Sequence, residues 1–581
     1  MTFGRAVVAA LAFAGLAAAL AGPSAAARST PAGDLAARAG APSAAPARLS
    51  EAGAVEPLLA HPKVADWLDR YPLDPQTDAT FDRERRAWTV HVWSGEAGEI
   101  ARGVVADATG RVTEAWTGPQ VAWHMARGRP GAFGGRTLTS WPVWLGLSAL
   151  FLVGLADRRR LLGLRTLDLL GLLSFGVSLA FFNRGEVFQS AALAVPSLVY
   201  VLVRMCVIGL RRGGSRRTSI ASSWPVWSLA VAALFLLGFR IGLNLQEGRR
   251  VIDVGYAGVI GADRILDGRV PYGAMPVTDG LEPCGKPNAD GEIRERIQSN
   301  GRCESANPRG DTYGPVAYLA YVPSVLTFGW SGRWDELPAA HATAILFDLL
   351  VLAGLVLVGR RFGGNLLAAA LAFGWVAYPF TSYVLLANSN DAVMPALLVW
   401  GFWLATSAPL RGAAVALAAW TKFAALLVAP LWLTYRSAWS AGRLLRFGGG
   451  FALATALAFS VLLLEPSLAD AARTFWERTF TFQLERDSPF SIWGWGQYRA
   501  RGIPDLASLQ TVVQAVVIVL AGVVAVVPRE KGPLELAALT AAVLAAFQLS
   551  LTHWFYLYLP WVLPFALLAL LLPRVPERES T

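Results

Sequence analysis

The chain has 581 residues, of which 54% are hydrophobic and only 16% are charged. Several apolar runs approach the roughly 20 residues that span a bilayer, which excludes an ordinary soluble protein and predicts a polytopic membrane protein. The net charge of +10 does not indicate nucleic-acid binding, because the arginines cluster at the ends of apolar runs, where they act as topology signals. We therefore expect no nucleic-acid partner.

The first 27 residues have the pattern of a signal peptide. Arg5 precedes the apolar run AVVAALAFAGLAAALAG, and small residues follow it at 24–27. A cleaved signal places the start of the mature chain outside the membrane, and an uncleaved N-terminal anchor is the alternative. The Ala/Pro-rich stretch 28–60 that comes next is typical of a flexible linker.

A small α+β domain is predicted from 61 to 135. HPKVADWLDRYP has a helical pattern, and ATFDRERRAWTVHVW, EIARGVVADATG and RVTEAWTG alternate like strands, with a hairpin turn at 107–110. This region resembles the PepSY-like domains found outside bacterial membranes, which implies a binding or regulatory role. His91 and His124 are lone histidines without metal-ligand spacing.

The remainder is predicted to be a series of membrane helices. In chain order they lie near 141–156, 165–182, 190–210, 223–245, 339–358, 365–386, 392–408, 447–464, 507–527, 533–550 and 556–573. Arginine clusters at 158–160 and 211–217 fall on the same side, which the positive-inside rule makes cytoplasmic. The N-terminal domain and the long 246–338 loop then both lie outside the plasma membrane.

Segment 412–434 does not fit a single crossing, because the arginines that follow it would then lie outside. We predict two half-helices that break near Lys422 and return, since irregular backbone at membrane depth is tolerated where it lines a protein cavity. The fold class is therefore a multi-pass α-helical membrane protein with about eleven spans, one re-entrant pair and an extracytoplasmic α+β domain.

Two of the three cysteines, Cys284 and Cys303, lie in the external loop, where an even pair predicts a disulfide. Cys206 lies within a predicted helix and is interpreted as a small buried hydrophobic residue.

Five sequence features come in a suggestive order. Asp253 follows a helix, then come DRILDGRVPYG, DTYGPVAYLAYVP, the polar turn NSND and ALAAWTKFAALLVAPLWL. In this order they resemble the GT-C fold glycosyltransferases, and among them the actinobacterial glycosyltransferase family 87, over roughly 220–575. The resemblance implies transfer of mannose from a polyprenyl-phosphate donor to a cell-envelope lipid or glycan. The NSND turn departs from the Gly-Gln usual in that family, so the acceptor stays open.

Such a reaction needs a base for the acceptor hydroxyl and cations for the departing phosphate. Asp253 is the predicted catalytic base, with a helix cap or an ion pair to Arg249 or Arg250 as the structural alternative. Asp263 is the second candidate, although it also suits a solvated helix end.

The predicted phosphate-binding residues are cationic. Lys422 is costly in an apolar setting unless it faces a cavity or a counter-ion, and we treat it as a buried unpaired charge; snorkelling to an interface is the alternative. Arg486 is a second candidate, or it forms an ion pair with Asp487 or Glu485.

Four further residues complete the predicted substrate site. His553 lies among Tyr and Trp and orients phosphate or acceptor, or it only joins an interfacial aromatic belt. Asn390 and Asp391 of the NSND turn, and Tyr313 of the DTYGP motif, are expected to bind substrate at the outer face. Asp348 lies inside a helix and suits a structural hydrogen bond as well as a catalytic role.

No metal cluster, Walker loop or dinucleotide fingerprint is visible in the sequence, so we expect no cofactor and a lipid-linked donor. A lipid or glycan transporter, or flippase, is the main alternative, because many helices and buried charges suit a midplane site. A sensor anchored by its membrane domain is a third.

Overall fold

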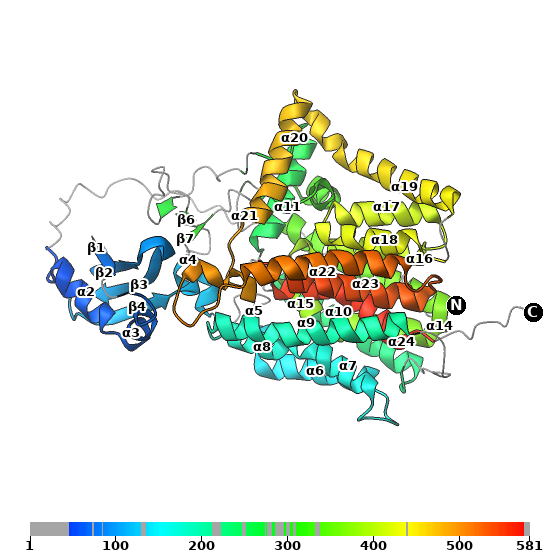
Figure 1. The fold of residues 1–581 in the computed structure, drawn as a ribbon, viewed down its shortest axis with the longest axis horizontal. Coiled ribbons are helices and arrows are strands. Elements are labelled where there is room, and N and C mark those ends of the chain that lie inside the picture. Colours follow the sequence, from blue (N-terminus) through cyan, green and yellow to red (C-terminus); the bar gives the residue numbers. More distant parts are fainter. Residues whose placement is uncertain are drawn as a thin grey trace, which may run out of the picture. The chain divides into compact units, whose positions relative to one another are not determined.

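The computed structural model describes most of the chain (Figure 1). The described ranges are 46–72, 75–83, 85–128, 135–211, 222–246, 251–273, 275, 282–284, 295–297, 303–305, 310–330, 332, 337–436 and 440–573. The predicted signal peptide and most of the predicted linker therefore lie outside the described residues. By its internal contacts the chain divides into an N-terminal unit and a larger helical unit, and each is described by itself.

The N-terminal residues form two helices followed by a four-stranded antiparallel sheet in the order β1-β2-β3-β4. The elements are α2 (Glu51–Leu59), α3 (Pro62–Leu68), β1 (Gln76–Asp82), β2 (Ala87–Trp93), β3 (Glu99–Ala106) and β4 (Val112–Thr117). The hairpin turn predicted at 107–110 is confirmed: Ala106 N donates to Arg111 O at 2.9 Å, and Gly110 has a φ of 69°. The predicted strands are therefore confirmed.

The predicted linker is wrong over Glu51–Leu59, which is helix α2. Ser50 caps this helix by accepting a hydrogen bond from Gly53 N at 3.1 Å, and Ala54 and Leu58 are fully buried. Small Ala and Gly residues gave the segment a low-complexity appearance, yet its buried residues recur at helical spacing.

The Asp107 carboxylate joins residues 48–49, directly before α2, to the turn between β3 and β4. It accepts hydrogen bonds from the backbone N–H of Arg48 (2.8 Å) and Leu49 (3.0 Å) and from Trp88 Nε1 (3.2 Å), and Arg86 pairs with it at 2.8 Å. The Leu49 hydrogen bond, followed by the weaker effects of Arg48, Trp88 and Arg86, lowers the pKa of Asp107 against the opposing effect of burial.

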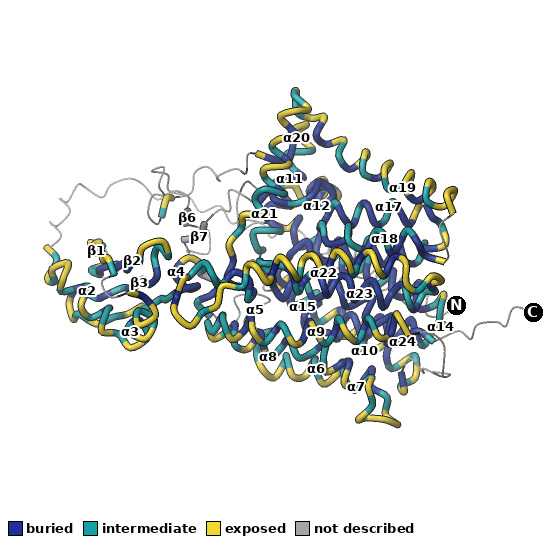
Figure 2. The backbone as a smooth tube through the Cα atoms, viewed as in Figure 1, coloured by how far each residue is buried: buried dark blue, intermediate teal, exposed yellow. Residues whose placement is uncertain are grey.

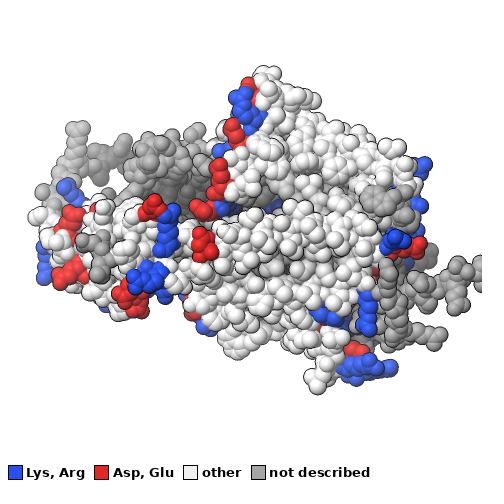
Figure 3. All heavy atoms as spheres, in the orientation of Figure 1, with Lys and Arg blue, Asp and Glu red and all other residues white. Residues whose placement is uncertain are grey.

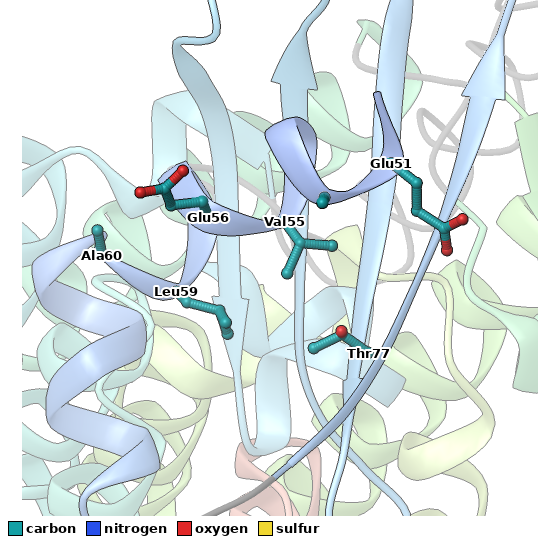
Figure 4. Close-up of a pocket in the computed structure, with 7 residues that line it drawn as sticks. Glu51, Val55, Glu56, Leu59, Ala60 and Thr77 are labelled. Carbon is teal, nitrogen blue, oxygen red and sulfur yellow. The ribbon is translucent and has the colours of Figure 1, made fainter. Parts of the chain in front are cut away.

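A surface groove of about 680 Å³ lies between α2 and β1 (Figure 4). Its lining residues are Glu51, Ala52, Val55, Glu56, Leu59, Ala60 and Thr77. β1 is an edge strand of the sheet, and Glu51 Oε1 accepts a hydrogen bond from Ala79 N at 3.2 Å. A charged side chain thus covers one edge amide, a common protection against strand pairing between molecules.

Among its described residues, the helical unit contains seven helices that are long and apolar enough to cross a membrane. They are Leu164–Phe182 (α7 and α8), Val187–Leu210 (α9), Val226–Gln246 (α10), Pro338–Ala377 (α14), Ala441–Leu464 (α19 and the following 3₁₀ turn η5), Ala507–Val526 (α22) and Pro533–Ser550 (α23). The described residues also form five shorter apolar helical segments: Trp141–Leu155 (α6), Pro315–Phe328 (α12 and α13), Ala408–Ala419 (α17), Phe423–Leu433 (η4 and α18) and Tyr556–Leu571 (η8 and α24). These helices are consistent with a polytopic membrane protein, whereas the count of about eleven spans stays a prediction.

The surface of the helical unit supports a membrane setting. In Figure 3 the visible side of α22 is white, and charged side chains gather toward the two ends of the long helices. Val512, Val516 and Ile518 of α22 are 57%, 60% and 64% exposed. By contrast α23 is largely enclosed by other helices, as its dark tube in Figure 2 shows. An apolar, uncharged outer helix packed over an enclosed one is expected where the solvent is lipid.

Two predicted interruptions in the helices are confirmed. Gly364 has a φ of 71°, so α14 consists of two helices that meet at a kink. Ala408–Ala419 and Phe423–Leu433 are separated by an extended Lys422, with φ −140° and ψ 119°. The guanidinium of Arg411 donates to Trp432 O at 2.7 Å, which brings the start of the first half-helix to the end of the second. The two half-helices therefore form a hairpin with Lys422 at its tip.

Candidate functional site

Helix α11 (Asp253–Leu266) places Asp253 against the polar turn that follows α15 (Pro379–Leu386). Ile252 N donates to Ala387 O at 3.2 Å, and Gly255 lies so close to Asn388 O that a side chain there would collide with it. Gly258 and Gly261 continue the same stripe at spacing three, facing aromatic rings of α12 and its C-terminal end. Because these glycines lack side chains, α11 approaches its neighbours closely enough to bring Asp253 to the turn.

The turn 388–391 is buried and internally hydrogen-bonded. Asn388 has a φ of 52°, a left-handed conformation that asparagine tolerates, and its Oδ1 accepts from Asn244 Nδ2 at 2.8 Å. Ser389 Oγ accepts from Asp391 N at 3.2 Å and donates to Asp391 Oδ2 at 2.8 Å. These contacts fix the direction of the Asp391 carboxylate.

Lys422 and Asp391 form a buried ion pair. Lys422 Nζ lies 3.2 Å from Asp391 Oδ1, and the two side chains are only 6% and 2% exposed. Trp561 Nε1, from α24 (Leu559–Leu571), donates to the same oxygen at 3.1 Å. The expectation that Lys422 is an unpaired charge is therefore wrong, because the counter-ion comes from a turn 31 residues earlier in the chain.

Three aromatic rings surround the Lys422 ammonium. Its Nζ lies 4.1 Å from the centroid of Tyr313, 5.8 Å from Trp561 and 6.0 Å from Tyr558. Each distance is within the range of a cation–π interaction, which is stronger where water is excluded.

Backbone contacts bring the DTYGP motif to the helix break. Val316 N donates to Trp420 O at 3.2 Å, and Gly314 packs directly against the same carbonyl. Tyr272 Oη donates to Tyr313 O at 2.9 Å from the other side. The loop that carries Tyr313 is thus fixed beside Lys422.

Tyr313 lies where the predicted site residues converge. Burial is the main cause that raises the pKa of its hydroxyl, the carboxylates of Asp253 and Asp391 raise it further, and the Arg486 guanidinium opposes them. Asp253, Asp391 and Arg486 thus influence the Tyr313 hydroxyl, and the Lys422 ammonium contacts the Tyr313 ring.

Arg486 follows the short helix α21 (Phe482–Glu485) and is held by aromatic rings. Its guanidinium carbon lies 5.8 Å from the ring centroids of both Trp123 and Phe482. Among the residues that the structure describes, Arg486 has no carboxylate partner, so the alternative of an ion pair to Asp487 or Glu485 is not observed. The guanidinium is a cation available to an anionic ligand.

His553 lies beside this arginine. Its Nδ1 is 2.8 Å from Ser488 Oγ, and its ring lies 6.0 Å from Trp123 and 5.7 Å from Phe490. Burial first, and then the positive charges of Arg486 and Lys422, lower the pKa of His553 well below its usual range. A neutral imidazole with an oriented ring is therefore expected at neutral pH.

Asp263 is not part of the cluster. It lies ten residues after Asp253 on the same helix, which corresponds to about 15 Å along the axis. Burial and the nearby Asp267 raise the pKa of Asp263, while Arg269 opposes them. This setting favours the helix-end interpretation of Asp263.

Asp348 has a structural environment. It forms an ion pair with Arg240 of α10 and accepts from Trp375 Nε1 at 2.8 Å, and both charged side chains are almost fully buried. Cys284 is disulfide-bonded and Cys206 is a free cysteine. The side chain of Cys303 lies outside the described residues, so its pairing with Cys284 stays a prediction.

Sequence reasoning missed several residues of the site. The site is also lined by Trp561, Tyr558 and Trp123. The first two lie in the motif SLTHWFYLYLPW, whose aromatic residues could equally form an interfacial belt, so the motif did not single them out. Asn390 Oδ1 and Tyr321 Oη are buried without a hydrogen-bond partner in the described structure. An orphaned buried acceptor and hydroxyl beside an ion pair are features of a site that is completed by a ligand or by water.

Comparison with protein-family models, with curated proteins and with solved structures finds no match. In the described part of the chain, no three His, Cys, Asp or Glu side chains are grouped as a metal ligand set. The site is therefore interpreted from its own chemistry: one carboxylate at a helix start, one buried ion pair and one cation without a counter-ion.

Proposed function

We propose that the protein is a membrane glycosyltransferase that moves a sugar from a polyprenyl-phosphate donor to a cell-envelope lipid or glycan at the outer face of the membrane. The observation that carries the proposal is geometric: Lys422 lies 3.2 Å from the Asp391 carboxylate and 4.1 Å from the Tyr313 ring, and the backbone at the start of α11, where the Asp253 carboxylate is, packs against the same buried turn. Glycosyl transfer from a lipid phosphate requires a base for the acceptor hydroxyl and a cation for the departing phosphate.

Asp253 and Arg486 have different tasks in the proposed chemical step. The Asp253 carboxylate takes the proton of the acceptor hydroxyl while that oxygen bonds to the anomeric carbon of the sugar. The bond between the anomeric carbon and the phosphate oxygen breaks, and the electron pair leaves with the polyprenyl phosphate. Arg486 stabilises the phosphate charge. Asp391 is a poor base because its carboxylate already binds Lys422, Trp561 and Ser389.

Mannose is the proposed sugar, because the motif order resembles family 87 of the GT-C glycosyltransferases. Backbone contacts hold the proposed site in place: the chain is extended at the Lys422 helix break, and Gly255 lets α11 pack against the turn at Asn388. Membrane location is supported by the seven apolar helices, and the outward orientation rests on the arginine distribution.

The test is incubation of membranes that contain the protein with radiolabelled polyprenyl-phosphate mannose and cell-envelope lipids. Wild-type membranes should form a labelled lipid or glycan. Asp253→Asn keeps the size of the side chain but cannot take up the proton, so turnover should fall about 10²–10⁴-fold. Asp263→Asn is the matched control and should retain near-normal turnover. If both variants transfer sugar like the wild type, the assignment of the base is wrong.

Transport of a lipid or glycan is the second candidate, favoured by the helical hairpin 408–433 with a buried charge at its break. The same vesicles distinguish the two functions. A transporter moves the labelled lipid between leaflets without changing its chemical identity, whereas a glycosyltransferase produces a new labelled product that chromatography separates.

A further inference from the structure

The segment 118–128, directly after β4, belongs to the helical unit and packs against residues 184–185 of that unit. Gln120 is 8% exposed and its Nε2 donates to Gly185 O at 3.1 Å. Gly128 packs against the backbone of Arg184 and Gly185, with no room for a side chain. Arg127 Nε donates to Gln120 O at 2.9 Å and ties the segment to itself. The backbone around Trp123 is therefore held on both sides.

Trp123, at the centre of this segment, contacts the candidate site. Its ring lies 5.1 Å from Phe490 in an edge arrangement and 6.0 Å from His553. The Arg486 guanidinium lies 5.8 Å from the same ring. One indole thus contacts both Arg486 and His553.

We propose that Trp123 is a positioning residue for the donor phosphate, which it serves by holding Arg486 in the orientation that binds the anion. The inference rests on the proposed function for the identity of the anion. Arginine has a long side chain that loses rotamer freedom when it binds, and a ring that already confines the guanidinium lowers this cost. Phe482 is the second ring on Arg486, so loss of Trp123 removes one of two supports.

This role extends the site beyond the part of the chain that resembles a glycosyltransferase. Trp123 precedes residue 220 by about a hundred positions and comes from the segment that leaves the sheet. The N-terminal portion of the chain would therefore supply a side chain to phosphate binding.

The test measures binding of decaprenyl phosphate to the purified full chain in detergent, together with KM and kcat for transfer. Trp123→Ala should weaken binding and raise the donor KM by about three- to tenfold, as expected for a lost cation–π contact. The value of kcat should fall as well, because Arg486 also stabilises the charge of the departing phosphate. Trp123→Phe keeps an aromatic face and should restore most of the affinity. Trp476→Ala removes an indole that is 58% exposed and should change neither quantity.

A double-mutant cycle separates positioning from general packing. If Trp123 acts through Arg486, then Arg486→Met and the double variant Trp123→Ala/Arg486→Met should bind decaprenyl phosphate equally weakly. Full additivity of the two losses would overturn the proposal, as would unchanged affinity in Trp123→Ala or equal losses in Trp123→Ala and Trp123→Phe. Absence of decaprenyl phosphate binding by the wild type would overturn it too. Binding without any sugar transfer would reject the glycosyltransferase function and retain the phosphate site.

Discussion

The buried pair between Lys422 and Asp391 should make a measurable contribution to stability. Removing one partner of a buried ion pair typically costs about 3–5 kcal/mol, because the other charge is left without compensation. Each partner here keeps some support. Asp391 retains hydrogen bonds from Ser389 and Trp561, and Lys422 retains its aromatic rings, so we expect about 3 kcal/mol for each of Lys422→Met and Asp391→Asn.

The assay is equilibrium unfolding in mixed detergent micelles for the two single variants and for the double variant Lys422→Met/Asp391→Asn. The double variant leaves no uncompensated charge, so its loss should be smaller than the sum of the single losses by about 1.5–3 kcal/mol. The exposed pair Arg269–Asp267, with side chains 58% and 53% exposed, is the control, and Arg269→Met should cost less than about 1 kcal/mol.

Two results would refute this reasoning. One is a cost in Lys422→Met no greater than in Arg269→Met, which would mean that the pair is hydrated. The other is strict additivity of the Lys422 and Asp391 substitutions, which would mean that the two charges do not interact across the 3.2 Å contact.

Three further predictions concern other parts of the chain. The pKa of Asp107 is lowered in the folded state, so its stabilising effect is present above the unfolded pKa of about 3.9 and is lost as the pH falls through the folded pKa. At any one pH above the folded pKa, pepsin should therefore cleave Asp107→Asn faster than the wild type. Equal cleavage rates would contradict the stabilising role of the Asp107 hydrogen bonds. Gly314→Ala should lower the free energy of unfolding by about 1–3 kcal/mol, because the added methyl group meets the backbone carbonyl of Trp420. Gly238→Ala is the control, because its methyl group meets no neighbouring atom, and it should not lower the free energy of unfolding. Equal effects of the two substitutions would mean that the loop at Gly314 can shift freely. A cysteine introduced at position 290 should react with an impermeant reagent in intact cells, and one at position 215 should not. The reverse labelling pattern would show that the two positions lie on the opposite sides of the membrane from those predicted.

Local patterns in the sequence predicted most elements of the fold. Alternation of apolar and polar residues predicted the strands, and long apolar runs predicted the seven long helices. The break at Lys422 was predictable because a single crossing contradicted the arginine distribution. Helix α2 was missed because composition was given more weight than periodicity.

Partners far apart in the sequence were not predictable. Lys422 was expected to lack a counter-ion because Asp391 comes from another helical segment, and Arg240 could not be assigned to Asp348, which is 108 residues away. Trp123 was missed because its neighbours Arg486 and His553 are more than 350 residues further along the chain. The sequence ranked Asp253 above Asp263 as the base, and the structure separates the two by ten residues along one helix.

The hairpin 408–433 has a consequence for how the protein enters a membrane. Its first arm, Ala408–Ala419, is 12 residues long and reaches only about 18 Å, while a hydrocarbon core is about 30 Å thick. Neither arm is long enough to be inserted as a span of its own, and the lysine at the tip opposes partition into lipid. The hairpin must therefore pack against neighbouring helices, and one of these, α19, is synthesised after it. Insertion of this segment then waits for synthesis of the following helix, and a chain truncated before residue 441 should leave the hairpin outside the bilayer core.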